Sequence, residues 1–194
     1  MMRGGYCCLF SLFIGSCWMD LYSKRYFMLG IKGSGMSSLA VLLHTFGSCV
    51  TGCDEEQYFS TEQTLKRAGI VYHTSFDVSN LDSSIETVIY SSAYPSDHPI
   101  LIKALSLKMQ VYSYPQFLAL LSRQQDSYAV AGTHGKTTTT TVTSYLLSEV
   151  SNNTFPFYTI CGSNEIGKDF AVAYGGDCAL FEACEYQDHF LLCS

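Results

Sequence analysis

Short apolar segments alternate with segments of helical spacing along residues 25–122, and this alternation limits the possible fold more than any other feature. Strands are predicted at residues 25–31, 48–53, 70–72, 87–90 and 110–112. Helices are predicted at residues 37–46, 61–68, 99–108 and 115–122. Such alternation is typical of an α/β fold, a parallel sheet with helices on its faces. Ligands of these sheets bind beyond the carboxyl ends of the strands.

A glycine-rich turn, Gly-Ile-Lys-Gly-Ser-Gly-Met at residues 30–36, follows the first predicted strand. With the next helix, the next strand and Asp54, it predicts the first half of a Rossmann-like unit. The glycine spacing differs from the Gly-x-Gly-x-x-Gly of dinucleotide sites, so another diphosphate ligand is favoured over NAD. Residues 30–36, Asp54 and residues 91–93 all follow strand ends, and we expect them to converge on one crevice.

A second strand, glycine turn and helix begin at residue 128, and the turn reads Gly-Thr-His-Gly-Lys-Thr at residues 132–137. This order predicts a phosphate-binding loop of the P-loop type, although the loop is two residues shorter than Gly-x4-Gly-Lys-Ser/Thr. Lys136 would lie across the β- and γ-phosphates, and the Thr137 hydroxyl would bind Mg²⁺. An ordinary strand-to-helix turn is the alternative. His134 either contacts phosphate or only fills the turn.

A further apolar run at residues 178–181 ends at Glu182. A carboxylate at the end of a strand beside a phosphate loop can be the second protein ligand of Mg²⁺, and Glu182 fits that place. For Glu185, Asp188 and His189, a solvated turn is an equally good interpretation.

Composition narrows the possible partners. The chain is 47% hydrophobic and 14% charged, which favours a folded protein over a disordered one. Its net charge is −6 and it has no cluster of lysine and arginine, so neither nucleic acid nor an anionic membrane is expected as a partner. Nine cysteines without a Cys-x-x-Cys pair predict reduced, mostly buried thiols in a cytoplasmic protein.

A polar break at residues 123–127 predicts a domain boundary. Residues 25–124 would form the Rossmann-like domain, and residues 125–194 the start of a P-loop ATPase domain. Residues 1–24 resemble a short export signal, but export would take a nucleotide-binding domain away from ATP. We therefore interpret them as an N-terminal extension, with the natural start at Met19.

Five motifs together resemble the Mur ligases of peptidoglycan synthesis, over about residues 25–194. The motifs lie at residues 30–36, 51–54, 89–93, 132–138 and 182–190. The resemblance implies a Rossmann-like domain for a UDP-sugar, a central ATPase domain and a C-terminal amino-acid domain. It also implies an enzyme that uses ATP and Mg²⁺ to join L-alanine to UDP-N-acetylmuramate through an acyl phosphate. Cys184 and Tyr186 stand where many members have Asp and Ser.

The resemblance also assigns roles to residues. The UDP-sugar would be bound by Gly33, Ser34, Gly35, Met36, Asp54, Ser91, Ser92 and Ala93. ATP would be bound by Gly132, Thr133, His134, Gly135, Lys136, Thr137 and Thr138. Lys136 would be the catalytic residue, and Thr137 and Glu182 the metal ligands. With no C-terminal domain after Ser194, we expect the chain to be a fragment without turnover of its own.

Three other functions are considered. One is a ligase of the same family that returns a murein tripeptide to UDP-N-acetylmuramate, although Ser34-Gly35-Met36 favours the alanine reaction. Another is a module that binds the UDP-sugar without catalysis. The third, an NAD-dependent oxidoreductase, would give Lys136 no role.

Overall fold

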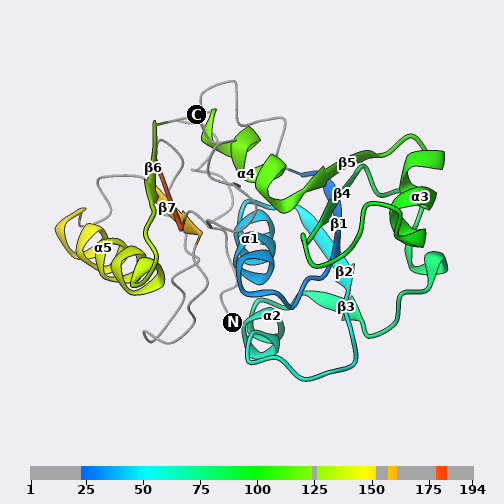
Figure 1. Ribbon diagram of the computed structural model, residues 1–194, viewed down its shortest axis with the longest axis horizontal. Coiled ribbons are helices and arrows are strands. Elements are labelled where there is room, and N and C mark those ends of the chain that lie inside the picture. Colours follow the sequence, from blue (N-terminus) through cyan, green and yellow to red (C-terminus); the bar gives the residue numbers. More distant parts are fainter. Residues whose placement is uncertain (1–22, 124–125, 152–156, 161–177, 183–194) are drawn as a thin grey trace, which may run out of the picture.

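A computed structural model describes residues 23–123, 126–151, 157–160 and 178–182. The described elements form two parallel sheets with helices around them (Figure 1). In the first sheet and its helices they are β1 (Arg25–Leu29), α1 (Ser34–Thr45), β2 (Cys49–Cys53), α2 (Glu62–Arg67), β3 (Val71–His73), η3 (Val78–Asn80), β4 (Thr87–Tyr90), α3 (Pro99–Ser106), β5 (Gln110–Ser113) and α4 (Tyr114–Ser122). The second group is β6 (Asp126–Val130), α5 (Lys136–Ser151), β7 (Phe157–Ile160) and β8 (Cys178–Glu182).

The first sheet has five parallel strands in the order β3-β2-β1-β4-β5. The chain moves outward from β1 to β3 on one side, then returns to pair β4 with the other side of β1. The strand order reverses between β1 and β4, and Rossmann-like sheets bind ligands at the carboxyl ends of the strands at such a reversal. The predicted Rossmann-like sheet is therefore confirmed.

Side chains on the two faces of β1 pack against different helices, which cover the first sheet on both sides. Tyr26 and Met28 pack into a core with α1, α2 and α4, while Phe27 and Leu29 pack into a second core with α3. All four side chains are at most 1% exposed. This burial on both faces follows from the two-residue period of a strand and gives β1 a continuous apolar sequence.

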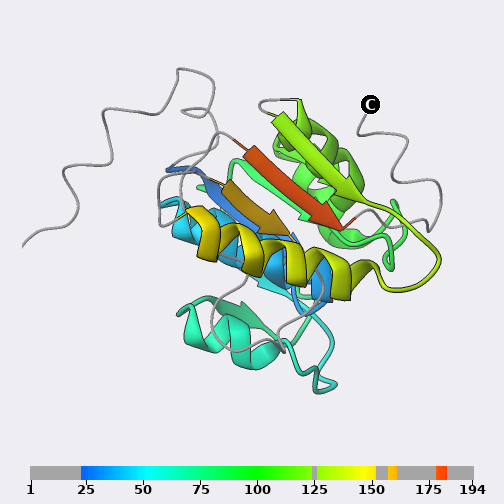
Figure 2. The same ribbon diagram turned by 90° about the vertical axis from the view of Figure 1, so that its left-hand side faces the viewer.

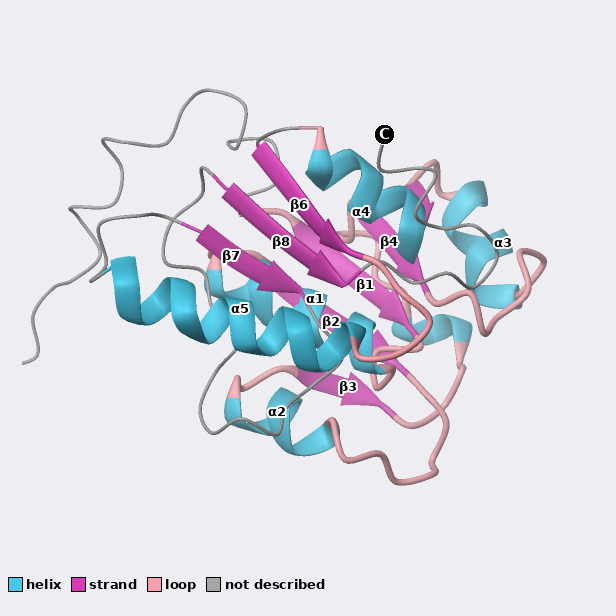
Figure 3. Ribbon diagram, turned by 60° about the vertical axis from the view of Figure 1, so that its left-hand side comes forward, coloured by secondary structure: helices cyan, strands magenta, loops and turns pink. Residues whose placement is uncertain are grey.

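The second sheet has three parallel strands in the order β6-β8-β7. Its residues Ile160, Ala179 and Phe181 belong to the same core as α1, so α1 lies between the two sheets (Figure 1). Helix α5 covers the other face, where the hydroxyls of Ser144 and Thr159 lie 2.9 Å apart (Figures 2 and 3). The P-loop order of strand, loop and helix is therefore present in the second sheet.

Some predicted boundaries were wrong. The first strand ends at Leu29, because Gly30 turns the backbone with a φ of +83°. Helix α1 begins at Ser34 and not at Ser37, so the end of the glycine turn is the first turn of the helix. Glycine and serine are weak helix formers, which is why the sequence pattern placed the start three residues late. The short strand β7 and the 3₁₀ helix η3 were not predicted.

The described residues include three cysteines. Cys53 and Cys178 are buried, Cys49 is exposed, and none of these three is in a disulfide. None of the described helices is both long and apolar enough to cross a bilayer.

Candidate functional site

Three separate segments meet at the carboxyl ends of β1, β2 and β4, which is the place of the predicted crevice. The backbone N–H of Lys32 donates to Asp54 Oδ2 at 2.6 Å, which joins the glycine turn to the end of β2. The backbone N–H of Ser91 donates to the carbonyl of Leu29 at 2.9 Å, which joins the residues after β4 to the end of β1. The predicted convergence of residues 30–36, Asp54 and residues 91–93 is therefore observed.

Asp54 is held firmly at the centre of this crevice. It is 4% exposed, and its Oδ1 accepts from the backbone N–H of Glu55 at 2.8 Å and from the Tyr94 hydroxyl at 3.0 Å. With the Lys32 N–H on Oδ2, three donors fix the carboxylate. A carboxylate offers about four acceptor positions, so these three donors do not use all of its acceptor capacity.

Two tyrosines line the glycine turn, and the sequence interpretation missed both. A Cβ atom added to Gly30 would lie 2.7 Å from the Tyr94 ring, and one added to Gly35 would lie 2.5 Å from the Tyr114 hydroxyl. These close approaches leave no room for larger residues. No periodic pattern in the sequence places either tyrosine beside the turn.

The start of α1 supplies the groups that would contact an anion. Gly33 precedes the helix without a side-chain cap, and the first turn holds Ser34, Gly35 and Met36. The first N–H groups of a helix have no partner within it, and they attract phosphate. Ser34 is exposed, whereas the Met36 side chain is 3% exposed and packs into the core. Only the backbone of Met36 is therefore available to a ligand.

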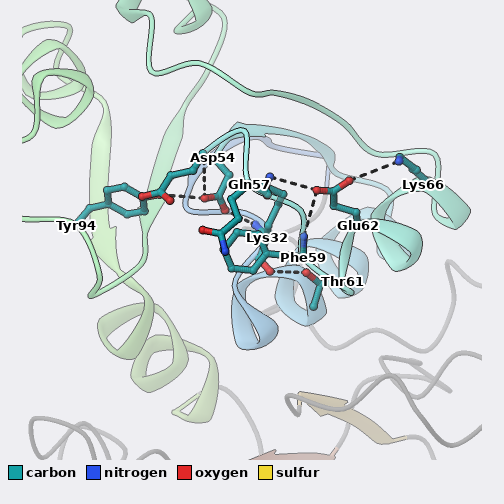
Figure 4. A network of polar contacts seen from close by, with 9 residues as sticks. Lys32, Asp54, Gln57, Phe59, Thr61, Glu62, Lys66 and Tyr94 are labelled. Carbon is teal, nitrogen blue, oxygen red and sulfur yellow. Dashed lines mark hydrogen bonds and ion pairs between the residues drawn. The ribbon is translucent and has the colours of Figure 1, made fainter.

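The position of the Lys32 side chain was not predicted. This side chain points away from the turn and is fully buried (Figure 4). Its Nζ donates to the carbonyl of Gln57 at 2.5 Å and lies 3.2 Å from Glu62 Oε1. It also lies 5.1 Å from the centre of the Phe59 ring. No role of Lys32 was predicted from the sequence, and neither was this burial.

Glu62 carries the charge that balances Lys32. Burial acts to raise the pKa of Glu62, but hydrogen bonds from Lys32 and the Phe59 N–H, with the nearby Lys32 charge, outweigh it and lower the pKa. A lowered folded-state pKa gives stability above the unfolded value of about 4.3 that is lost as pH falls through the folded value.

Replacing Glu62 with glutamine is therefore expected to flatten the acid side of the stability profile. Between about pH 5 and about pH 3, the urea midpoint of the wild type should fall more than that of Glu62→Gln. The exposed Glu55 gives a matched control in Glu55→Gln. Equal slopes for the wild type and Glu62→Gln would show that this carboxylate has no part in acid unfolding.

The neighbouring thiol and phenol stay protonated at neutral pH. Burial and the Asp54 charge raise the pKa of Cys53 to about 12. Burial, the Asp54 charge and the hydrogen bond to Asp54 raise the pKa of the Tyr94 hydroxyl. Tyr94 is therefore a hydrogen-bond donor in this crevice, and Cys53 is no nucleophile.

The phosphate-type loop at residues 132–137 leads from β6 into α5, as predicted. Gly135 has a φ of +79°, which a residue with a side chain would adopt only with strain. Lys136 is the first residue of α5, and its Nζ folds back to donate to the carbonyl of Gly132. The side chain thus already lies over the loop that would hold a phosphate. Thr133, His134 and Thr138 are exposed.

The two predicted metal ligands lie next to each other. Strands β6 and β8 pair in parallel with Val130 opposite Glu182, so β8 ends beside the start of the loop. The Thr137 hydroxyl donates to Glu182 Oε1 at 2.5 Å. A hydroxyl and a carboxylate are hard oxygen donors that suit Mg²⁺, which takes one or two carboxylates and completes its shell with phosphate and water. The residues present therefore fit this metal.

Other parts of the chain add little to the site. A groove of about 380 Å³ lies at the edge strand β5 and α4, and none of the predicted site residues lines it. Over the described ranges, no three His, Cys, Asp and Glu side chains gather to bind a metal. Cys184, Glu185, Tyr186, Asp188 and His189 lie outside the described residues, as does nearly all of residues 1–24.

Comparison with known proteins identifies the same family that the five sequence motifs resemble. Residues 25–126 match the model of the Mur ligase family, catalytic domain. The chain is 39% identical over 173 residues to UDP-N-acetylmuramate–L-alanine ligase of Borreliella burgdorferi, a match that covers 85% of this chain and 36% of that protein. It is 40% identical over 166 residues to the protein of the same name from Lactiplantibacillus plantarum, covering 86% and 36%.

Solved structures share the fold. The UDP-N-acetylmuramate-alanine ligase of Thermotoga maritima superposes with a TM-score of 0.69 at 24% identity, covering 82% of this chain and 36% of that one. A UDP-N-acetylmuramate:L-alanyl-γ-D-glutamyl-meso-diaminopimelate ligase from Neisseria meningitides gives 0.66 at 24% identity, covering 84% and 53%. The chain spans 36% of the length of the curated relatives.

Proposed function

Because the chain belongs to the Mur ligase family, we propose that it binds UDP-N-acetylmuramate at the first crevice and ATP at the second. Residues 25–124 form the UDP-sugar domain and residues 125–194 contribute to the ATP domain. One observation carries the proposal: a single chain has two glycine turns, each between a strand end and a helix, and each beside an acidic residue. Two nucleotide substrates are what an ATP-dependent ligase of a UDP-sugar needs.

In the proposed UDP-sugar site, the diphosphate lies at the start of α1. Gly33, Ser34, Gly35 and Met36 offer backbone N–H groups to it, and helix N-termini favour negative charge. Asp54 accepts a hydroxyl of the nucleotide in its remaining acceptor position. The turn after β4 forms the opposite wall of the crevice, with Ser91, Ser92 and Ala93.

The proposed reaction has two steps. The lactyl carboxylate of UDP-N-acetylmuramate takes the γ-phosphoryl group of ATP, which gives an acyl phosphate and ADP. The amine of L-alanine then attacks the acyl carbon, the amide bond forms, and phosphate leaves. Phosphoryl transfer depends mainly on positioning and on neutralising charge.

This chain supplies the groups for that neutralisation. Lys136 is the proposed catalytic residue, because its ammonium can move from the Gly132 carbonyl to the phosphates. Gly132, Thr133, His134, Gly135, Thr137 and Thr138 surround the same phosphates. Thr137 and Glu182 are proposed to hold Mg²⁺, which supplies further positive charge when bound. We assign no residue of this chain to L-alanine.

The choice of L-alanine over a murein tripeptide rests on the sequence relatives. Proteins that are 38–40% identical to this chain are named for L-alanine. Two solved structures named for peptide ligases are 24% and 26% identical to this chain, lower than the identity of the relatives named for L-alanine.

Calorimetry tests the first half of the proposal. UDP-N-acetylmuramate titrated into this chain should bind saturably with one-to-one stoichiometry. ATP with Mg²⁺ should bind in addition to it and not in competition with it. No heat at millimolar UDP-N-acetylmuramate, or displacement of one nucleotide by the other, would contradict two separate sites.

Replacing Glu182 with glutamine is expected to remove most of the effect of Mg²⁺ on ATP affinity. Mg²⁺ is bound through only one or two carboxylates, so losing one should shrink the gain from Mg²⁺ about tenfold or more. Calorimetry with ATP, with and without Mg²⁺, measures this gain. Glu149→Gln is the matched control, because Glu149 is exposed on α5. An undiminished gain in Glu182→Gln would exclude Glu182 as a metal ligand.

A further inference from the structure

Lys32 joins the glycine turn to three other segments through hydrogen bonds and an ion pair. Its backbone N–H donates to Asp54 Oδ2, and its carbonyl accepts from the Thr61 hydroxyl at 2.5 Å. Its ammonium binds the carbonyl of Gln57 and the carboxylate of Glu62 (Figure 4). One residue of the glycine turn is thus tied to the end of β2, to the loop after it and to the start of α2.

Burying the Lys32 ammonium costs free energy, and the contacts of the ammonium offset this cost. An ammonium taken out of water costs several kcal/mol unless it is paired and hydrogen-bonded. Here the Lys32 side chain is 0% exposed, and the Glu62 side chain is 12% exposed. The rings of Phe59 and Tyr72 lie 5.1 and 6.0 Å from Lys32 Nζ. Apolar residues of similar volume would often be as stable in such a place, so stability does not explain the pair.

We propose that Lys32 is a positioning residue, whose buried pair with Glu62 holds the turn at residues 30–36 and Asp54 in the arrangement that binds the UDP-sugar. The ammonium does not touch the ligand. It fixes the path of the backbone from Gly30 to Lys32. The Lys32 N–H on this part of the backbone orients Asp54. Ligand affinity falls when the binding groups are not already held in place, because ordering them on binding costs free energy. This inference rests on the proposed UDP-sugar site.

A double replacement separates positioning from stability. Lys32→Met alone removes the buried partner of Glu62 and leaves it only the exposed Lys66, so both the urea midpoint and the UDP-N-acetylmuramate affinity should fall. In Lys32→Met with Glu62→Leu, no buried charge remains, and the urea midpoint should return close to that of the wild type. The affinity should nevertheless stay about tenfold or more below the wild type. A double variant with wild-type affinity would overturn the proposal.

Lys66→Met is the matched control. Lys66 Nζ lies 3.5 Å from Glu62 Oε2, yet its side chain is 68% exposed. This lysine binds the same carboxylate without touching the glycine turn, so its replacement should leave both affinity and midpoint near the wild type. If Lys66→Met weakened binding as much as the double replacement does, the charge of the region and not the position of Lys32 would be responsible.

Amide hydrogen exchange keeps this inference distinct from the proposed function. In the double variant without ligand, amides of residues 30–36 should exchange at least about tenfold faster, with the strands of the first sheet unchanged. If wild-type protein does not bind UDP-N-acetylmuramate, the proposed function fails, and the exchange result still tests positioning. Unchanged exchange at residues 30–36 would refute the positioning role.

Discussion

Replacing Lys136 with methionine is expected to weaken ATP binding about ten- to hundredfold. Hydrogen bonds to charged groups contribute about 1.5–3 kcal/mol, and methionine keeps the length of the side chain without its charge. The Lys136 side chain already bonds to the loop carbonyl of Gly132, so it lies at the proposed phosphate site. Calorimetry with ATP and Mg²⁺ measures the loss.

Two comparisons make the Lys136 result specific. Lys103→Met removes an exposed lysine from α3 and should leave ATP affinity unchanged. UDP-N-acetylmuramate affinity should be unchanged in both variants, because the first crevice lies in the other sheet. ATP binding by Lys136→Met at wild-type strength would mean that the loop at residues 132–137 is not the ATP site.

Replacing Gly52 with alanine is expected to reduce the free energy of unfolding by about 3 kcal/mol or more. Gly52 is buried in β2, and an added Cβ would collide with the carbonyl oxygen of Met28 on β1. It would also lie 3.0 Å from Cδ1 and 3.1 Å from Cβ of Ile31. Neither strand can move aside, because β1 is paired on both sides.

Urea unfolding measures this loss, and Gly47→Asn is the control. Gly47 also needs its present conformation, with a φ of +88°, but nothing lies within 4 Å of an added Cβ. Asparagine tolerates that backbone conformation, so the control should lose about 1 kcal/mol or less. A Gly52→Ala variant as stable as Gly47→Asn would show that the two central strands are not packed as closely as described.

The parallel fold could be predicted because its strands are buried on both faces. Residues 26–29 are apolar in succession, and alternation with helical segments leaves a parallel sheet as the simple solution. The meeting of Thr137 and Glu182 was also predictable. Both follow a strand end, and parallel neighbouring strands end at the same edge.

Other features depend on tertiary packing that a linear pattern does not carry. The start of α1 at Ser34 is set by the turn and not by residue preference, since glycine and serine are poor helix formers. Lys32 is charged, yet the Gln57 carbonyl and Glu62 on α2 direct its side chain inward. Tyr94 and Tyr114 come to the glycines from other elements of the fold. The division into domains and the ligand contacts of the site residues stay predictions.

The central claim is that one chain has a UDP-sugar site and a separate ATP site. Amide chemical shifts of the labelled chain, recorded with each ligand in turn, test it most directly. UDP-N-acetylmuramate should shift residues 33–36, Asp54 and residues 91–93, while ATP with Mg²⁺ should shift residues 132–138 and Glu182. UDP-N-acetylmuramate shifts confined to residues 132–138, or no shifts at residues 33–36 and Asp54 with saturating ligand, would contradict the account.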